Sequence, residues 1–270
     1  MLKFRFVAFH IAFLVAVIWV PWTTESLWLG FALYWIRMFG VTAGYHRYFA
    51  HRSYKTSRTF AFILAWIAQS SAQRGVIWWA SNHRHHHRYS DLPEDLHSPV
   101  TSSLFHAHVG WLWDSKSYEY RKNATDLERC PELVWLNQYP MIPAFVLAIV
   151  CYLWMDWSGV VYGFGISTIV LFHGTFTINS LTHVWGKRRF NTKDDSRNNV
   201  WLAIITMGEG WHNNHHRYMR SVRQGFYWWE FDPTYYVLSV LSWVGIVWDF
   251  RSIPSEVLSE GMETNSLTVS

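Results

Sequence analysis

Long apolar runs alternate with short polar turns along this chain. Residues 6–20 and 27–43 flank the turn sequence PWTTES, and residues 133–155 and 159–178 flank a second turn near Asp156. Runs of roughly 15 to 23 residues suit a hydrocarbon layer of about 30 Å, above all when they pair in tight hairpins. The pattern predicts an all-α integral membrane protein with four transmembrane helices in two hairpins, at about residues 6–20, 27–45, 133–155 and 159–180.

A cleavable signal peptide is the alternative for the first apolar run. No small-residue cleavage site follows Val20, because Pro21 and Trp22 stand in that place. Signal peptides end in small residues at the cleavage site. We therefore expect the first run to be a retained span.

Positive charges indicate how these helices are oriented. Lys3 and Arg5 precede the first run, basic residues cluster in 47–58 after the second, and the two short turns carry neither Lys nor Arg. The positive-inside rule then places both termini and the long loops in the cytoplasm. We expect residues 46–130 and 183–250 to form a cytoplasmic helical cap.

Two segments need a separate interpretation. The apolar stretch 60–80 is interrupted by Gln69, Gln73 and Arg74. If it crossed the membrane, the polar clusters on its two sides would face opposite compartments, so we expect an in-plane or re-entrant helix. Residues 255–270 are polar and have no apolar period, which predicts a disordered tail after a single domain over residues 1–254.

Composition adds a preference for anionic partners. The chain has 270 residues, half of them apolar, and 19 tryptophans, which suits one large domain with aromatic belts at the membrane interface. A net charge of +4 and a pI near 9.0 favour anionic lipids, phosphorylated head groups or an acidic protein as partners. We expect no nucleic-acid partner.

Three clusters of histidine carry the sharpest chemical signal. They are HRYFAH (46–51), HRHHHRYSDLPED (83–95) and HNNHH (212–216). In the second and third clusters, histidines stand at positions i, i+3 and i+4 on one helical face, so each trio is shaped like half of a metal site. His46 and His51 are about 140° apart on an ideal α-helix, so we expect His46 in the last turn of a helix and His51 in the following loop.

A lone histidine is more often a satisfied surface or core residue than a metal ligand. Eight histidines in three clusters reverse that preference, and they exceed what one tetrahedral zinc ion can use. No carboxylate stands between the histidines of a cluster, in contrast to di-iron bundles with Glu and His ligands. The clusters predict an all-nitrogen site for two metal ions, from which His85, at i+2, points away.

Five motifs in this order resemble one known family. They are TAGYHRYFAHRSYK (42–55), NHRHHHRYSDLPEDLHSP (82–99), HVGW (108–111), NSLTHVWG (179–186) and GEGWHNNHH (208–216). Over residues 6–250 the chain resembles the integral-membrane fatty acyl desaturases of the delta-9, acyl-CoA type, in the short form without a fused cytochrome b5 domain. The resemblance implies a cytoplasmic cap that holds two iron ions. The implied ligands are His46, His51, His83, His86, His87, His183, His212, His215 and His216, with Asn179 bound through a water.

The resemblance also implies the reaction. Dioxygen and external electrons are used to remove two hydrogens from adjacent methylenes of a fatty acyl thioester, leaving water and a cis double bond that we expect at delta-9. An alkyl chain offers no polar handle, so a closed apolar tunnel must fix the reacting carbon.

Several residues are candidates for lining that tunnel. Tyr34 lies twelve residues before His46, about 18 Å along a helix, and is our candidate for the tunnel floor. A lipid-facing or helix-packing role is the alternative for Tyr34. Gly30, one turn deeper, would leave room for a chain end, and Trp79 and Phe176 are further lining candidates.

Basic residues on the cytoplasmic side are candidates for holding the head group, with Arg74 and Lys116 among them. The positive-inside rule alone can also explain the presence of any one of these basic residues. Animal acyl-CoA enzymes of this family carry Arg-Asp directly before the second cluster, where this chain has Ser81 and Asn82. The acyl carrier therefore stays open between CoA, a carrier protein and a membrane lipid.

Electrons must reach the metal site from outside. The sequence shows neither a haem-binding domain nor a dinucleotide motif, so we expect a separate donor of the ferredoxin, rubredoxin or cytochrome b5 type. Arg217, Arg220 and Arg223 have i, i+3 and i+6 spacing, which predicts a positive helical stripe that docks the donor or the anionic head group. The short form favours a bacterial inner membrane.

Two other classes share part of this pattern. A membrane di-iron hydroxylase or alkane monooxygenase has similar clusters, and product analysis separates it from a desaturase. A non-catalytic metal transporter or sensor needs polar residues along its spans, where His10 and His173 are the only histidines outside the clusters. We expect His97, His106 and His108 to support the ligands or to pack the cap.

Overall fold

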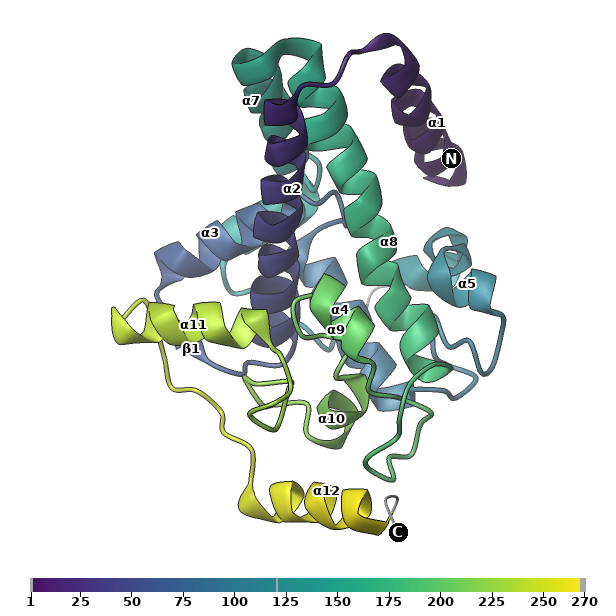
Figure 1. Ribbon diagram of the computed structural model, residues 1–270, viewed down its shortest axis with the longest axis vertical. Helices are drawn as coiled ribbons and strands as arrows, with labels where there is room; N and C mark the ends of the chain where they lie inside the picture. The colour runs from purple at the N-terminus through teal and green to yellow at the C-terminus, as the bar shows by residue number, and fades with distance from the viewer. Residues whose placement is uncertain (1, 120, 268–270) are drawn as a thin grey trace.

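The computed structural model describes residues 2–119 and 121–267, and its regular structure is mostly helical (Figure 1). A small antiparallel sheet joins β1 (Lys55–Thr56) to β2 (Val247–Trp248), with Lys55 opposite Trp248. The prediction of a mostly helical protein is confirmed.

Apolar helices form the upper half of the molecule in Figure 1. The helices α1 (Leu2–Trp19) and α2 (Thr24–Phe39) run antiparallel, as do α7 (Ile142–Ser158) and α8 (Ser167–Ser180). Between α1 and α2, the Thr23 hydroxyl accepts a bond from the Ser26 amide, which starts α2. The π-helix η1 (Gly40–Ala50) continues α2. The π-helix η4 (Gly159–Ile166) precedes α8, and η5 (Leu181–His183) ends it.

Within the part of the chain that the structure describes, two continuous stretches are long and apolar enough to cross a membrane, Thr24–Ala50 and Ile142–His183. The second reverses direction at Met155 and Asp156, whose backbone is not helical, so it forms two arms. The predicted spans 27–45 and 159–180 lie within these stretches. The predicted span 133–155 was misplaced at its start, because α6 (Pro131–Gln138) is a separate helix that precedes α7.

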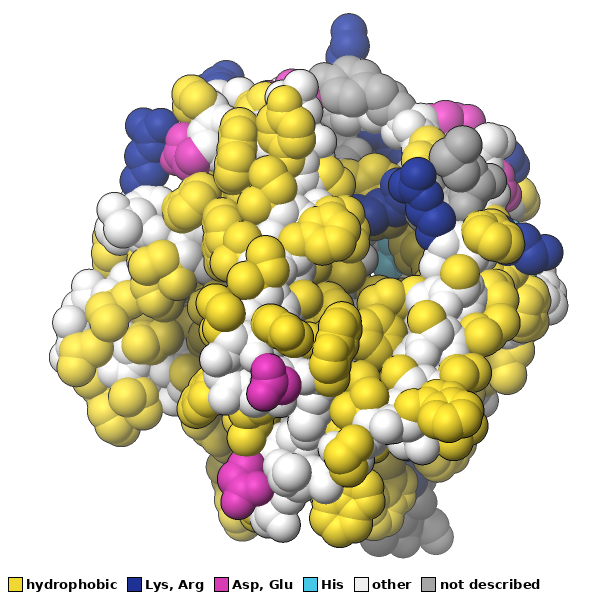
Figure 2. All heavy atoms as spheres, turned by 90° about the horizontal axis from the view of Figure 1, so that it is seen from above, with side chains coloured by type: hydrophobic (Ala, Val, Ile, Leu, Met, Phe, Trp, Pro, Cys, Tyr) yellow, Lys and Arg dark blue, Asp and Glu magenta, His cyan; other side chains and the backbone are white. Residues whose placement is uncertain are grey.

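The end of the molecule formed by these helices is dominated by hydrophobic side chains (Figure 2). Trp19, Leu153 and Trp154 are among the most exposed large apolar side chains. A soluble surface rarely carries a patch of this size, so the face suits lipid rather than water.

Shorter helices surround the lower part of α2 and α8 in Figure 1, and two of them, α4 and α10, carry the second and third histidine clusters. Their bounds are α3 Arg58–Gln69, α4 Val76–Tyr89, α5 Leu104–His108, η2 Gly110–Trp113, η3 Ser115–Tyr118, α9 Val200–Ile205, α10 His212–Arg217, α11 Pro233–Trp243 and α12 Ser255–Leu267.

The stretch 60–80 is not one helix. A turn between α3 and α4 holds Ala72 and Arg74 in left-handed backbone conformations, and Gly75 packs so closely on Asn137 that a Cβ would lie 2.3 Å from its Oδ1. With 12 residues, α3 is about 18 Å long, too short for a hydrocarbon layer of about 30 Å. Its orientation relative to a membrane stays a prediction.

The predicted disordered tail was wrong for residues 255–267, which form α12. Val257 packs in a buried cluster with Phe190, Phe226 and Tyr227, and the Tyr227 hydroxyl donates to the Leu258 carbonyl at 2.8 Å. A few contacts hold this helix against the cap. Because so few residues make them, the sequence shows no long apolar period. Residues 268–270 of that predicted tail lie outside the described residues.

Candidate metal centre

The first histidine pair owes its geometry to a π-helix. His46 lies in the last turn of η1 and His51 follows its end, as predicted. The His51 amide donates to the His46 carbonyl at 3.1 Å, an i+5 bond that places the second residue above the first. The two ring centroids are 4.8 Å apart. The α-helical separation of about 140° therefore does not apply.

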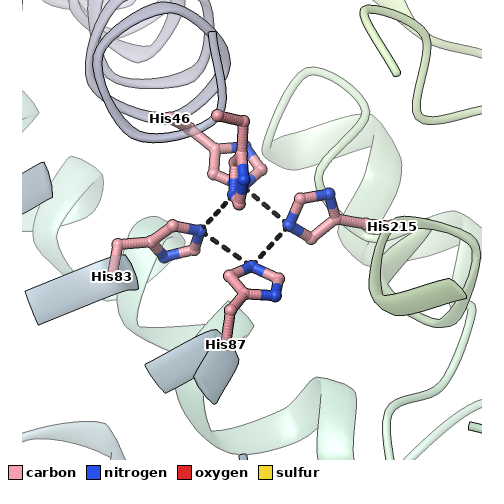
Figure 3. A group of neighbouring side chains, drawn as sticks. His46, His83, His87 and His215 are labelled. Atoms are coloured by element: carbon pink, nitrogen blue, oxygen red, sulfur yellow. Dashed lines mark hydrogen bonds between the residues drawn. The ribbon is translucent and has the colours of Figure 1, made fainter. Parts of the chain in front are cut away.

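Five histidines converge in a first group: His46, His51, His83, His87 and His215. Four of them are labelled in Figure 3, with their ring nitrogens turned toward one centre. The Nε2 atom of His215 lies 3.0 Å from that of His46 and 2.8 Å from that of His87. The Nε2 atom of His83 lies 2.7 Å from that of His51 and 3.0 Å from that of His87.

Four histidines form a second group: His86, His183, His212 and His216. The Nε2 atoms of His183 and His212 are 3.1 Å apart. The second and third sequence clusters are thus divided, because the second sends His86 to this group and the third sends His215 to the first group. The expectation that one trio makes one half of a site was wrong. The helices α4 and α10 instead lie between the two groups and serve both.

Carboxylates hold the far nitrogens of several of these rings. An imidazole that donates from Nδ1 to a carboxylate is fixed in orientation and becomes a stronger donor to a metal through Nε2. The pairs are His46 with Glu209 at 2.5 Å, His86 with Asp95 at 3.0 Å, His183 with Asp91 at 2.9 Å and His216 with Asp194 at 2.7 Å. Sequence reasoning missed all four acids. Glu209 lies in GEGW, directly before the histidines of the third cluster, and Asp91 and Asp95 lie in SDLPED, after the histidines of the second.

Burial keeps most of these imidazoles neutral. It lowers the pKa well below the usual value, and the neighbouring imidazoles lower it further, in His51, His83, His87, His212 and His215. Burial also lowers the pKa of His216, to about 4, although Asp194 opposes the shift. A metal ligand must be neutral imidazole, so these six rings are suited to bind a cation.

The supporting acids are held in their charged form, whereas the imidazoles are held neutral. Burial alone would raise the pKa of Asp91, Asp95 and Asp194, but the facing imidazoles lower it below its usual range. The three carboxylates are therefore charged beside the second group.

The donor set fits two metal ions. Imidazole nitrogens about 2.1 Å from one ion at right angles are about 3.0 Å apart, close to the separations of 2.7 to 3.1 Å between Nε2 atoms in both groups. Within the described residues, His216 Nε2 is buried without a hydrogen-bond partner, as expected of a nitrogen that faces an ion. Imidazole suits iron, copper, zinc and nickel, so the donors alone do not select one metal.

A cavity of about 40 Å³ touches both groups. His46 and His83 of the first group line it, and so do His86 and His212 of the second. Its other walls include Trp79, whose ring stacks on His83, and Asn179. The structure thus brings Trp79 and Asn179 to the site, while a water on Asn179 stays a prediction.

Tyr34 lines a larger apolar groove and packs against the cluster that contains Met38, a residue of the cavity wall. The groove, of about 680 Å³, runs between α2 and α8 and is lined by Gly30 and Tyr34. The Tyr34 hydroxyl donates to the Ile205 carbonyl at 2.5 Å, and a Cβ on Gly174 would lie 2.9 Å from that hydroxyl. Gly30 serves helix packing, because a Cβ there would lie 2.6 Å from the Tyr162 carbonyl oxygen.

Other candidates lie away from the cavity. Phe176 packs with Phe172 and Val109 and lines neither the cavity nor the groove, so its predicted lining role is not supported. Lys116 is exposed on η3. His85 lies outside both histidine groups and contacts the Glu94 carbonyl at 2.9 Å.

The other cap histidines support their surroundings. His97 is buried with its ring 4.4 Å from that of His86, His106 contacts the Leu96 carbonyl at 3.2 Å, and His108 contacts Ser180 at 2.9 Å.

Arg74 lies at the turn before α4 with its guanidinium over two aromatic rings. The distances to the ring centroids of Trp78 and Tyr118 are 4.7 and 4.1 Å. Burial lowers the pKa of Arg74 to about 10, and among the described residues its guanidinium donates to the Tyr118 hydroxyl and pairs with no carboxylate. The adjacent Gln73 donates to Thr175, which lines the cavity.

The predicted arginine stripe was wrong. Helix α10 ends at Arg217, so Arg220 and Arg223 are not on the same helix. Arg217 pairs with Glu260 of α12, and Arg223 donates to the Tyr227 carbonyl at 2.7 Å. Arg220 is exposed.

Membrane-length apolar segments and two histidine groups that could each hold a metal ion are typical of membrane proteins with histidine-bound metals. Comparison with known proteins is more specific. The model of the fatty acid desaturase family matches residues 5–248, so the chain belongs to this family. The protein is accordingly an oxidoreductase that acts on acyl chains.

Individual relatives differ in their acyl carriers. The chain is 38% identical over 261 residues to an acyl-CoA C20 delta-5 desaturase of Anemone leveillei, covering 92% of this chain and 83% of the relative. It is 34% identical to a chloroplastic palmitoyl-monogalactosyldiacylglycerol delta-7 desaturase of Arabidopsis thaliana, covering 95% and 70%. It is 36% identical to a hex-5-enoyl-[acyl-carrier protein] acetylenase of Moorena producens, covering 86% and 79%.

Proposed function

We propose that this protein is an oxygen-dependent fatty acyl desaturase that introduces a cis double bond, at delta-9, at a di-iron centre in the cap. We further propose four spans in two hairpins, with both termini in the cytoplasm. Electrons come from a separate ferredoxin, rubredoxin or cytochrome b5-type protein. The location in a bacterial inner membrane stays a prediction.

One observation carries the proposal: nine buried or half-buried histidines form two groups, and a single cavity touches both. Two iron ions held there would activate dioxygen, the oxidant that removal of hydrogen from unactivated methylenes requires. The protein's own part is to fix the imidazoles through Glu209, Asp91, Asp95 and Asp194, and to exclude water around the acyl chain.

The position of the reacting carbon follows from the walls of the cavity. We propose that the acyl chain passes Trp79 beside the two histidine groups and ends at Tyr34. The hydrogen bond from Tyr34 to Ile205 holds the phenol across the path to the groove. The chain length beyond the double bond is then set by the distance between the metal groups and Tyr34.

We propose that Arg74 holds an anionic part of the acyl carrier. Its half-buried guanidinium lies on two aromatic rings without a carboxylate partner among the described residues, and Gln73 connects its turn to the cavity wall. An anion that arrives with the substrate would form a charge-assisted hydrogen bond with this cation. Lys116 of the nearby η3 would add a second positive charge. The relatives act on CoA, galactolipid and carrier-protein substrates, so the carrier must be measured.

Expression in a desaturase-deficient host, followed by fatty-acid profiling, tests this function. We expect new monounsaturated acids in cells with the wild-type protein, and none with a His215→Ala variant present at equal abundance. Chemical derivatisation of the double bond reports whether it lies at delta-9. Hydroxylated acids in place of alkenes would instead favour the hydroxylase class, and no change in lipid composition would contradict both functions.

A further inference from the structure

Helix α11 exposes an apolar stripe that its position in the cap does not explain. The stripe consists of Tyr236, Val237, Val240, Trp243 and Val244, which follow the i, i+1, i+4, i+7, i+8 spacing of one helical face. Trp243 is 82% exposed and Val240 is 51% exposed. The opposite face is buried at Thr234 and Leu238. The apolar stripe therefore faces away from the rest of the protein.

Charged residues are absent from the whole segment 233–248. Asp232 precedes it and is buried, and Asp249 follows it and pairs with Lys55 at 2.8 Å. The Ser239 hydroxyl is satisfied within the helix, because it donates to the Tyr235 carbonyl at 2.8 Å. The polar atoms on the side chains of the stripe are the Tyr236 hydroxyl and the Trp243 indole nitrogen, and both side chains suit the head-group region of a membrane.

The length and direction of α11 exclude a span. Its 11 residues extend about 16 Å, roughly half of a hydrocarbon layer. Figure 1 shows it lying across α2, at the level of α9 and above α10. The short helix α9 also exposes Trp201, Ile204 and Ile205. Apolar side chains thus continue from the hydrophobic helices onto the upper edge of the cap.

The buried side of α11 is connected to a metal-site histidine. Asp232 caps the helix by accepting from the Tyr235 amide at 3.0 Å, and it also binds Arg47. Arg47 binds Glu209, which holds His46 at 2.5 Å. The hydroxyls of Thr234 and Thr42 lie 2.7 Å apart and join α11 to η1.

We propose that α11 is an in-plane anchor that seats in the leaflet on the side of the histidine groups, with its stripe among lipid acyl chains and Trp243 at the head-group level. The partner is the lipid bilayer. Through Asp232, Arg47 and Glu209, the seated helix fixes the height of His46, and hence of the cavity, relative to the membrane surface. This inference rests on the proposed membrane topology.

Nitroxide labels on single cysteines test the seating. Val240→Cys would be made in a full-length protein in which Cys130 and Cys151 are replaced, and the labelled protein would be placed in phosphatidylcholine nanodiscs. Glu256→Cys on α12, exposed at the far end of the cap, is the aqueous control. Ile149→Cys on α7, 58% exposed, is the control for a span. Oxygen partitions into bilayers and a charged nickel chelate stays in water, so their relative collision rates report the surroundings of each label.

We expect the ratio of oxygen to chelate collisions at Val240 to exceed that at Glu256 several-fold and to approach that at Ile149. A label at Val237 or Val244 should agree, which guards against one poorly folded variant. A ratio at Val240 equal to that at Glu256, with Ile149 in lipid, would overturn the anchor and leave the membrane topology intact. An aqueous Ile149 would overturn the topology itself. Low collision rates with both reagents at Val240, with spin–spin broadening, would assign the stripe to a second copy and overturn the lipid assignment.

Discussion

The two histidine groups reach a similar geometry with different charge. The first has five imidazoles and one supporting carboxylate, Glu209, which also binds Arg47. The second has four imidazoles and three supporting carboxylates, Asp91, Asp95 and Asp194. Arg47 compensates the charge in the first group before any metal arrives. Among the described residues, the acids of the second group pair with histidine and not with Arg or Lys.

This difference suggests a division of labour. Three charged acids favour a strongly bound and highly charged ion in the second group. The first group lies at the junction of η1 with the apolar helices, and its acid belongs to a buried network that also includes Asp232. We therefore expect changes in the first group to affect folding as well as metal binding, and changes in the second to affect mainly metal binding.

The largest effects should follow from removing one ligand of each group. His86→Ala and His87→Ala are neighbours on α4 that belong to different groups, so each should lose about one of two ions and lower desaturation by about 100-fold or more. His85→Ala is the matched control and should keep both ions. Elemental analysis of the purified variants measures the loss. Equal metal loss in all three variants would contradict the division of α4 between two groups.

Replacing the supporting acids should separate metal binding from stability. Asp194→Asn should weaken metal affinity by about 10- to 100-fold with a small change in folding. Glu209→Gln should in addition lower the free energy of unfolding by about 3 to 5 kcal/mol, because it leaves Arg47 with a single acid in a buried network. Metal titration and thermal unfolding of both variants make the comparison. A lower stability of Asp194→Asn than of Glu209→Gln would contradict this separation of roles.

Replacing Tyr34 should have a smaller effect than replacing a ligand or a supporting acid. Tyr34→Ala should open the path from the cavity to the groove and shift the products toward longer acyl chains. Tyr34→Phe keeps the ring and removes only the hydrogen bond to Ile205, so it should change the chain-length profile much less. Cells fed mixed fatty acids report both profiles. An unchanged profile for Tyr34→Ala would move the tunnel floor elsewhere.

The smallest effect concerns the surface beside the second group. Arg220→Glu should raise the Michaelis constant for the electron donor, and the wild-type rate should fall as ionic strength rises, because an exposed charge is screened within about 8 Å at physiological salt. Arg217→Gln is the contrasting variant. It loses an exposed ion pair with Glu260, which contributes at most about 1 kcal/mol to stability. A salt-independent rate would limit both arginines to structural roles.

The sequence predicted the histidines better than it predicted their arrangement. The clustering and spacing of the histidines identified eight of the nine, because imidazole-rich motifs are rare and lie close together in the sequence. The family resemblance added His183. The division of each trio between two groups depends on the packing of α4 against α10. The i+5 bond at His51 depends on a π-helix, and neither feature has a local sequence period. The supporting acids were missed because they act across the fold, as Asp91 does on His183.

The errors in the predicted fold also come from features that have no local sequence period. The apolar run 60–80 suggests one element, but the contact of Gly75 with Asn137, 62 residues later in the chain, breaks it. Helix α12 depends on a few contacts such as Val257 with Phe190, which a search for periodic patterns does not detect. The arginine stripe was inferred from spacing alone, whereas the helix ends at Arg217.

The central claim is that two unlike histidine groups each hold one iron ion. Mössbauer spectroscopy of the purified protein, grown on Mössbauer-active iron and fully loaded, tests it most directly. Groups with one and with three supporting carboxylates should give two distinct quadrupole doublets of equal area, and Asp194→Asn should alter only one of them. A single doublet at one iron per chain, or a protein that retains zinc and excludes iron, would contradict the account.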